Sequence, residues 1–223
     1  MATMVSTKPG RKASPGSGPK VPGPNGNGSR PHDHFRDSEF RWNRYRIGMW
    51  VALASVAMLF TSLSSAYIVR SASSNDWVQL PLPRILLAST VLIVASSATL
   101  EAARRKLKAA LNALYSRWLF ATLLLGIAFI VAQLVAWRQL VRQGIYLASN
   151  PHSSFFYLLT GAHAVHLVGG MMGLIFLWLG SRRPVIETEL IAKRKAATDA
   201  VTIYWHFMDA LWIYLFLLLF LWR

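Results

Sequence analysis

Five long apolar stretches are separated by shorter polar segments along most of the chain. They cover residues 47–69, 82–100, 118–137, 155–179 and 200–221. Each is close to the roughly 20 residues that an α-helix needs to cross the hydrocarbon core of a bilayer. The pattern therefore predicts an all-α integral membrane protein, in which residues 44–223 form a bundle of five transmembrane helices.

Residues 1–43 differ from the rest, because they are rich in Gly, Pro, Ser and Lys and offer little apolar surface to bury. Such a composition predicts a disordered basic N-terminal tail. The start of the chain shows no apolar core of a secretory signal, so we expect no signal to be cleaved. The basic residues of the tail can contact anionic lipid headgroups, although solvation of the tail is the simpler interpretation.

The chain has a formal net charge of +15, and its basic residues lie mainly outside the apolar stretches. Lysine and arginine concentrate in the tail and in the loops after the second and fourth apolar stretches, and an excess of these residues marks the cytoplasmic side of a membrane protein. We therefore expect a multi-pass protein with a cytoplasmic N-terminus and with Arg223 outside, and no nucleic-acid partner. The chain has no cysteine, which excludes disulfides and thiolate metal sites.

Two histidines lie well inside the fourth stretch. His163 and His166 share a helix face because they are three residues apart, and the spacing of Gly169 and Gly173 lets a neighbouring backbone approach closely. Ionisable groups at this depth are costly and tend to serve a function. We therefore expect the fourth helix to be buried among the others, with its histidines turned inward.

The fifth stretch carries a second polar pair, His206 and Asp209. We expect Asp209 to pair with His206 or with a lipid headgroup, and the neighbouring tryptophans to pack or to cradle lipid chains. The lipid-binding or structural polar centre that we predict consists of His163, His166, His206, Asp209, Trp205 and Trp212.

Other polar residues inside the stretches have simpler expectations. Gln133 is suited to a hydrogen bond between helices, typically worth about 1 kcal/mol or less. Four hydroxyls of the second stretch are expected to bond to the backbone of their own helix; they belong to Thr90, Ser96, Ser97 and Thr99. His152 precedes the fourth stretch and is expected to be exposed in a loop.

The polar residues also allow a metal site or a proton path. Histidines three residues apart can bind a metal, but a complete site needs further ligands, and only His206 and Asp209 are available. With a rise of 1.5 Å per residue, His166 would lie about 5–8 Å deeper than Asp209. A proton path would use the same residues, but the first three stretches contribute no carboxylate. We recognise no nucleophile with its base and no phosphate-binding loop, so we expect this chain to hold no catalytic residue, cofactor or metal.

Four stretches resemble, in the same order, motifs of subunit III of the haem-copper oxidases. FFYLLTGAHAVHLVGGMMGL (155–174) is similar to the family signature FxLTGxHxxHVxxG, and YWHFMDALWIYLF (204–216) is similar to its C-terminal motif YWHFVDxVWxxLF. IGMWVALASVAMLFTSLSSAY (47–67) and STVLIVASSATL (89–100) resemble two further motifs. The similarity covers about residues 46–222.

The resemblance implies a non-redox subunit of the short form with five spans, in the inner (plasma) membrane of a bacterium. Members of the family bind no haem and no copper, which are expected in partner subunits I and II. They hold phospholipid between groups of helices and support assembly and proton uptake of the catalytic subunit in aerobic respiration. All six residues of the predicted polar centre match family motif positions.

Two acidic positions of the family are missing. An intramembrane Glu of the first motif falls at Val56, and a frequent Glu after the third helix falls at Ala136. These losses favour a divergent branch of the family, and two alternatives therefore stand beside the oxidase subunit, the second of them independent of the losses. One is the accessory subunit of a nitric oxide reductase, which shares the fold; the other is an independent small transporter or channel that uses the intramembrane histidines and Asp209. The apolar first three stretches argue against the aqueous path that a transporter needs.

Overall fold

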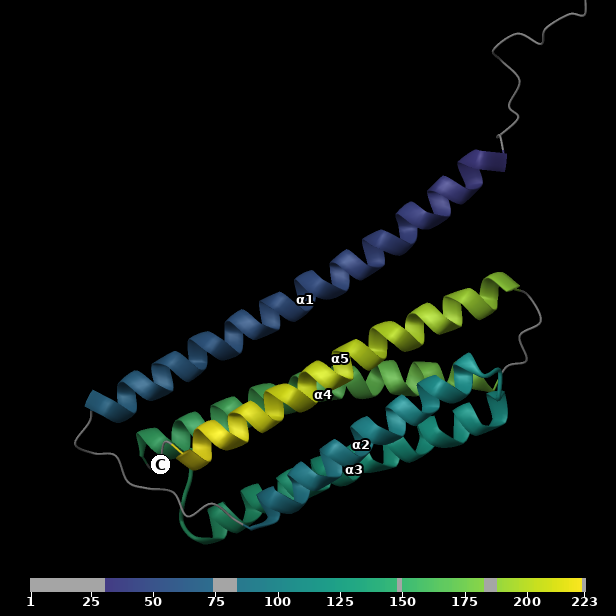
Figure 1. Cartoon of the computed structure of the whole chain (residues 1–223). Coiled ribbons are helices and arrows are strands. Elements are labelled where there is room, and N and C mark those ends of the chain that lie inside the picture. Colours follow the sequence, from purple (N-terminus) through teal and green to yellow (C-terminus); the bar gives the residue numbers. More distant parts are fainter. Residues whose placement is uncertain (1–30, 74–83, 148–149, 183–187, 222–223) are drawn as a thin grey trace, which may run out of the picture. The chain divides into compact units, whose positions relative to one another are not determined.

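The computed structural model describes residues 31–73, 84–147, 150–182 and 188–221. Within these ranges the chain forms α1 (Pro31–Ser73), α2 (Ile85–Lys108), α3 (Asn112–Arg142), α4 (Pro151–Ser181) and α5 (Thr188–Leu221) (Figure 1). All five helices are long and apolar enough to cross a membrane, α1 from Ile47 onward and α5 from Glu189 onward. The prediction of an all-α membrane protein with five spanning helices is therefore confirmed.

The chain divides into two units, Met1–Asn43 and Arg44–Arg223. In the first unit, residues 31–43 are helical, whereas we expected them to belong to the disordered tail. Pro31 stands at the first helical position, where its missing N–H does no harm, and the residues that follow it up to Asn43 include no glycine. The disorder predicted for residues 1–30 concerns a segment outside the described ranges, so it stays a prediction.

The helices extend beyond the apolar stretches that predicted them. α2 continues through Glu101 and Arg104 to Lys108, and α5 begins at Thr188, well before Ala200. Apolar residues mark only the part of a helix that suits the hydrocarbon core, whereas the helix itself continues for as long as its backbone hydrogen bonds do. The charged ends of α2 and α5 are therefore helical continuations of the spans.

α4 also begins earlier than its apolar stretch, because Asn150 caps it. The Asn150 side chain accepts a hydrogen bond from the backbone N–H of Ser153, and the Ser153 hydroxyl accepts one from the N–H of Asn150. This reciprocal arrangement is a capping box, and Pro151 follows it at the start of the helix. The cap therefore places the first turn of α4 before Phe155.

Helices α2 to α5 pack in an alternating bundle. In Figure 1, α2 and α3 lie side by side, as do α4 and α5. α2 is antiparallel to α3, because Ser89 contacts Gln133 while Thr99, further along α2, contacts Thr122, earlier on α3. α2 is also antiparallel to α5, since Thr90 contacts Trp212 while Arg104 contacts Asp199. As a result, α3 and α5 run in the same direction.

α4 and α5 approach each other closely at two glycines. A Cβ on Gly170 would lie 3.0 Å from the ring of Tyr204 and 3.2 Å from the ring of Trp205, and a Cβ on Gly173 would lie 3.3 Å from a side chain of α5. Gly169 is exposed, and a Cβ there would meet Tyr204 only at 3.7 Å. The predicted close approach occurs, but it centres on Gly170 and Gly173 instead of Gly169.

Aromatic side chains connect α1 to α4. The Phe60 ring lies 5.7 Å from the ring of His166, and the Tyr67 ring lies 5.8 Å from the ring of Phe155. Much of the remaining surface of α1 from Ile47 onward is apolar and exposed within this chain. Such a surface suits contact with lipid chains or with another membrane protein.

Candidate functional site

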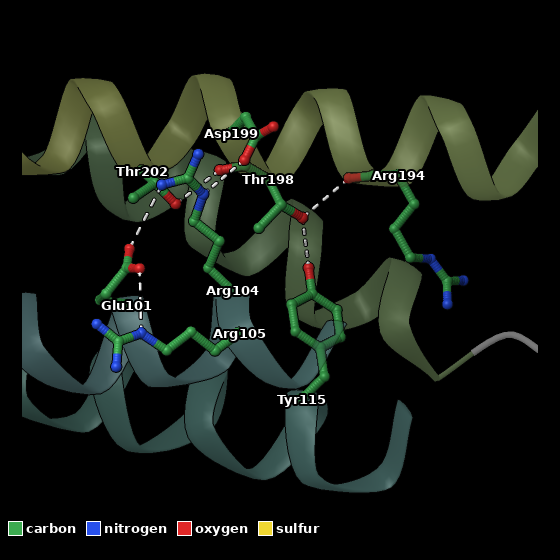
Figure 2. Close-up of polar contacts among 8 residues, drawn as sticks. All are labelled: Glu101, Arg104, Arg105, Tyr115, Arg194, Thr198, Asp199 and Thr202. Carbon is green, nitrogen blue, oxygen red and sulfur yellow. Dashed lines mark hydrogen bonds and ion pairs between the residues drawn. The ribbon is translucent and has the colours of Figure 1, made fainter. Parts of the chain in front are cut away.

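A cluster of ion pairs lies where α2 ends and α5 begins. Arg104 Nε on α2 donates a hydrogen bond of 2.6 Å to Asp199 Oδ1 on α5 (Figure 2). The Glu101 carboxylate lies 3.5 Å from Arg104 Nη1 and 3.4 Å from Arg105 Nε. The side chains of Arg104 and Asp199 remain 30% and 42% exposed, so solvent weakens their attraction. The cluster thus forms a polar, partly hydrated layer at the end of the bundle.

Tyr115 at the start of α3 joins this charged end to α5. It is fully buried, and its hydroxyl is hydrogen-bonded to Thr198 Oγ1 at 2.8 Å (Figure 2). Thr198 donates its own proton to the carbonyl of Arg194, so Tyr115 is the donor in the bond that they share. The Arg194 guanidinium donates to the carbonyl of Gly180 at 2.7 Å, which ties α4 to the same end.

Two tryptophans connect α5 to α2 deeper in the bundle. The indole N–H of Trp205 donates to Ser96 Oγ at 3.0 Å, and that of Trp212 donates to Thr90 Oγ1 at 3.1 Å. Both tryptophans are buried. The hydroxyls of Ser96 and Thr90 donate in turn to backbone carbonyls of α2, as predicted. Each hydroxyl therefore serves its own helix as a donor and α5 as an acceptor.

His206 and Asp209 do not form the predicted pair. His206 Nδ1 is hydrogen-bonded to the Ser97 hydroxyl on α2, whereas neither carboxyl oxygen of Asp209 has a hydrogen-bond partner in the described part of the chain. The pairing with His206 was wrong because a hydroxyl of the neighbouring helix competes for this ring, whereas the pairing of Asp209 with a lipid headgroup stays a prediction. Ser97 was likewise expected to bond to its own backbone, but its hydroxyl turns to α5 and lies near the Asp209 carboxyl.

These contacts form one row between two helices, which we call the α2–α5 seam. Its members are Thr90, Ser96, Ser97, Glu101 and Arg104 on α2, with Asp199, Trp205, His206, Asp209 and Trp212 on α5. Four of the six residues of the predicted polar centre thus lie in this seam, and α2 contributes the groups opposite them.

His163 borders the seam at Trp212 and is enclosed by aromatic rings of three helices. Its ring centroid is 6.4 Å from that of Phe60, 6.2 Å from that of Phe129 and 5.2 Å from that of Trp212. It is 1% exposed, and neither ring nitrogen has a hydrogen-bond partner among the residues that the structure describes. Because buried polar atoms are nearly always paired, packing alone does not explain a histidine at this position.

His166 has a different environment from His163, although both rings contact Phe60, as expected for one helix face. It is half-buried, and its Nδ1 is hydrogen-bonded to the carbonyl of Ala162 at 2.8 Å. Its own carbonyl accepts a hydrogen bond of 2.8 Å from the Tyr204 hydroxyl. His166 therefore contributes mainly to the contact between α4 and α5.

The histidines and Asp209 are not gathered into one cluster. Across the described ranges, no group of three or more His, Cys, Asp or Glu side chains is placed to hold a metal ion. His206 is bound to α2, while His163 contacts Trp212. The arrangement can form hydrogen bonds between helices and exchange protons.

His152 was expected in an exposed loop, but it is fully buried in the first turn of α4. Its Nε2 lies 3.3 Å from the Tyr67 hydroxyl of α1, within hydrogen-bond distance. The capping box starts the helix before this residue and so turns it inward. The signal was present in the sequence, where an asparagine and a serine flank Pro151 and His152 with the spacing of an N-cap.

Gln133 forms the predicted bridge between helices. Its Nε2 donates to Ser89 Oγ on α2 at 2.9 Å, and Ser89 donates to the carbonyl of Leu86. The Gln133 amide oxygen is buried without a hydrogen-bond partner in the described residues. Within this part of the chain, the amide nitrogen therefore has a hydrogen-bond partner and the amide oxygen has none.

All six residues of the predicted polar centre, with Thr90, Ser96 and Ser97 opposite them, fall within the four sequence stretches noted above, whereas the charged cluster lies outside them. The family model described as cytochrome c oxidase subunit III matches residues 38–223. The chain belongs to the cytochrome c oxidase subunit III family. The resemblance found in the sequence is thereby confirmed. The matched residues include all five spanning helices, of which α1 spans from Ile47 onward.

Individual subunit III relatives are similar over most of both chains. A probable cytochrome c oxidase subunit 3 of Nocardia farcinica is 32% identical over 184 residues, covering 79% of this chain and 87% of the relative. The cytochrome c oxidase subunit 3 of Corynebacterium diphtheriae is 29% identical over 188 residues, with the same coverage. The cytochrome bo(3) ubiquinol oxidase subunit 3 of Pseudomonas aeruginosa is 26% identical over 196 residues, covering 85% and 89%. The chain is thus a multi-pass membrane protein of bacterial type.

Proposed function

We propose that this chain is the non-redox subunit III of a haem-copper terminal oxidase of the cytochrome c oxidase type. The observation that carries the proposal is the match of the subunit III family to residues 38–223. Haem and copper would be bound by partner subunits I and II. On α5, the side chains of Asp199, Trp205, His206 and Trp212 each pair with one side chain of α2. Such contacts between helices suit a supporting subunit of aerobic respiratory electron transport.

The names of the relatives favour cytochrome c as the electron donor of the complex. The two relatives from Nocardia and Corynebacterium, at 32% and 29% identity, are named as cytochrome c oxidase subunits, and the ubiquinol oxidase subunit is 26% identical. A quinol-dependent complex is therefore the less favoured member of the same class.

The proposed contribution is assembly, lipid binding and support of proton uptake by the catalytic subunit. The apolar side of α1 offers surface for phospholipid or for subunit I, with Trp50 59% and Met58 74% exposed in the isolated chain. The tryptophans and His206 of the polar centre would keep α5 on α2, while His166 would keep α4 on α5. We place the protein in the bacterial plasma membrane, with the N-terminus and the charged end of the seam cytoplasmic.

A pull-down from native membranes tests this function. The tagged full chain is extracted in a mild detergent, and the product is examined by visible spectroscopy and mass spectrometry, with an untagged strain as control. We expect haem absorption to co-purify together with a large polytopic subunit, and the spectrum then gives the oxidase class. Recovery with a nitric oxide reductase, or of a colourless chain without partners under conditions that preserve such complexes, would overturn the proposal.

A further inference from the structure

One ionisable group of the α2–α5 seam has no evident structural purpose. Asp209 is 4% exposed, and neither carboxyl oxygen has a hydrogen-bond partner in the described ranges. Leaving a buried polar group unpaired costs about 1–3 kcal/mol, and more for a charged group. A carboxyl at membrane depth is thus maintained at a cost, which points to a function.

Ser97 connects this carboxyl to a titratable ring. Its hydroxyl is hydrogen-bonded to Nδ1 of His206 and lies near the carboxyl of Asp209. A hydroxyl can accept one proton while donating another, so it can pass a proton between the two groups. His206 is partly exposed, unlike Asp209, and it lies on α5 between Asp209 and the charged end of the bundle.

The charged end of the bundle lies next to His206. Glu101 follows Ser97 by one turn of α2, and its negative charge acts on His206 together with the positive charge of Arg104. The Glu101 side chain is 32% exposed, so it reaches the hydrated layer formed by the ion pairs. The charged layer, His206 with Ser97, and Asp209 therefore follow one another along the seam.

The surroundings on the other sides of Asp209 are mainly apolar. From α4, His163 packs against Trp212, about one turn beyond Asp209, and His166 contacts Tyr204, which precedes Asp209 on α5. From α3, Phe129 packs against the same tryptophan. From residue 210 to Leu221, α5 carries no further acidic or basic side chain. Among the described residues, the titratable groups of the path thus lie on the side of the charged end, and we place the end of the path at the carboxyl.

We propose that Asp209 is an intramembrane proton-binding site, loaded from the charged end of the bundle through His206 and Ser97. In one transfer, a proton binds Nε2 of His206 and Nδ1 releases its proton to Ser97 Oγ. The Ser97 hydroxyl, once it rotates within hydrogen-bond distance of the nearby carboxylate, passes its original proton to Asp209. Asp209 gains one proton and Ser97 is unchanged. His206 ends as the other neutral tautomer, and the reverse sequence or a ring flip restores it.

Infrared spectroscopy of the full chain in phospholipid nanodiscs tests the site without any oxidase partner. Spectra are recorded across the neutral pH range, and the carboxyl band of Asp209 is identified by its loss in Asp209→Asn. The rate at which this band shifts after perfusion with D2O then measures proton access. We expect Ser97→Ala to slow this exchange about 100-fold, the lower end of the usual contribution of a positioned proton-transfer group.

Two further variants separate the relay from the stability of the seam. Ser97→Thr keeps the hydroxyl and should exchange at close to the wild-type rate. Thr90→Val removes the contact with Trp212 on the same two helices but leaves the relay intact, so it should not slow the exchange. The proposal is overturned if Asp209→Asn removes no band, if Ser97→Ala exchanges at the wild-type rate, or if Thr90→Val slows exchange as strongly as Ser97→Ala.

Discussion

The contact between α4 and α5 at Gly170 leads to a quantitative prediction for Gly170→Ala. The added methyl would lie 3.0 Å from the Tyr204 ring and 3.2 and 3.3 Å from two atoms of the Trp205 ring. Non-bonded carbon atoms prefer separations of about 3.5–4.0 Å. Either the two helices must move apart by several tenths of an ångström, or the rings must leave their positions.

Trp205 cannot shift without a further loss, because its indole N–H donates to Ser96 at 3.0 Å. Overpacking of this kind costs about 1–3 kcal/mol. Alanine returns about 1 kcal/mol through its higher helix propensity. We therefore expect Gly170→Ala to lower the free energy of unfolding by about 0–2 kcal/mol, with a central value near 1 kcal/mol.

Unfolding in mixed micelles, induced by a denaturing detergent and followed by tryptophan fluorescence, measures this change. Gly180→Ala is the matched control, because it lies on the same helix and a Cβ there meets no atom within 4 Å. The control should be as stable as the wild type or slightly more stable. If Gly170→Ala behaved like Gly180→Ala, our account of close packing between α4 and α5 would be refuted.

Three further predictions concern other parts of the chain. Only one end of the Gln133 amide has a hydrogen-bond partner, so Gln133→Leu should cost less than about 1 kcal/mol in the same unfolding assay. Ser89→Ala leaves the buried amide unpaired and should cost about 1–3 kcal/mol. The reverse order of the two costs would contradict the assigned contact. Val56 is partly buried against the apolar core, so Val56→Glu should lower stability by about 2–3 kcal/mol, and an unchanged stability would show that a polar partner receives the new carboxyl. Since the chain has no cysteine, Lys108→Cys and Gln143→Cys can each be labelled alone in intact cells and in inverted vesicles. An impermeant thiol reagent should reach Gln143→Cys from outside and Lys108→Cys only from the cytoplasmic side. The opposite result would invert the proposed topology.

The sequence was sufficient for the features that depend on composition and on motifs. The apolar stretches indicated five spans because a bilayer requires long uncharged helices, and the motifs around His163 and His206 indicated the family. Gln133 was correctly expected to bridge two helices, because its amide has few partners on its own helix.

The features that were missed depend on which helix lies beside which. Ser97 was expected to bond to its own backbone, and only the position of α5 reveals that its hydroxyl contacts His206. The same holds for Gly170, since a close approach cannot be assigned to one glycine before the facing rings are known. His152 is different, because the capping box formed by Asn150 and Ser153 is a local pattern that the sequence itself contains.

The attachment of α1 has a consequence for the order in which the protein is made. Phe60 and Tyr67 contact α4, which is synthesised only after α2 and α3, so α1 must reside in the bilayer before its partner exists. The hydroxyls of Ser55 and Thr61 donate to carbonyls of α1 itself, so these groups are satisfied even in a solitary helix. During biosynthesis α1 is therefore an independent membrane anchor, which is captured late, when α4 inserts beside it.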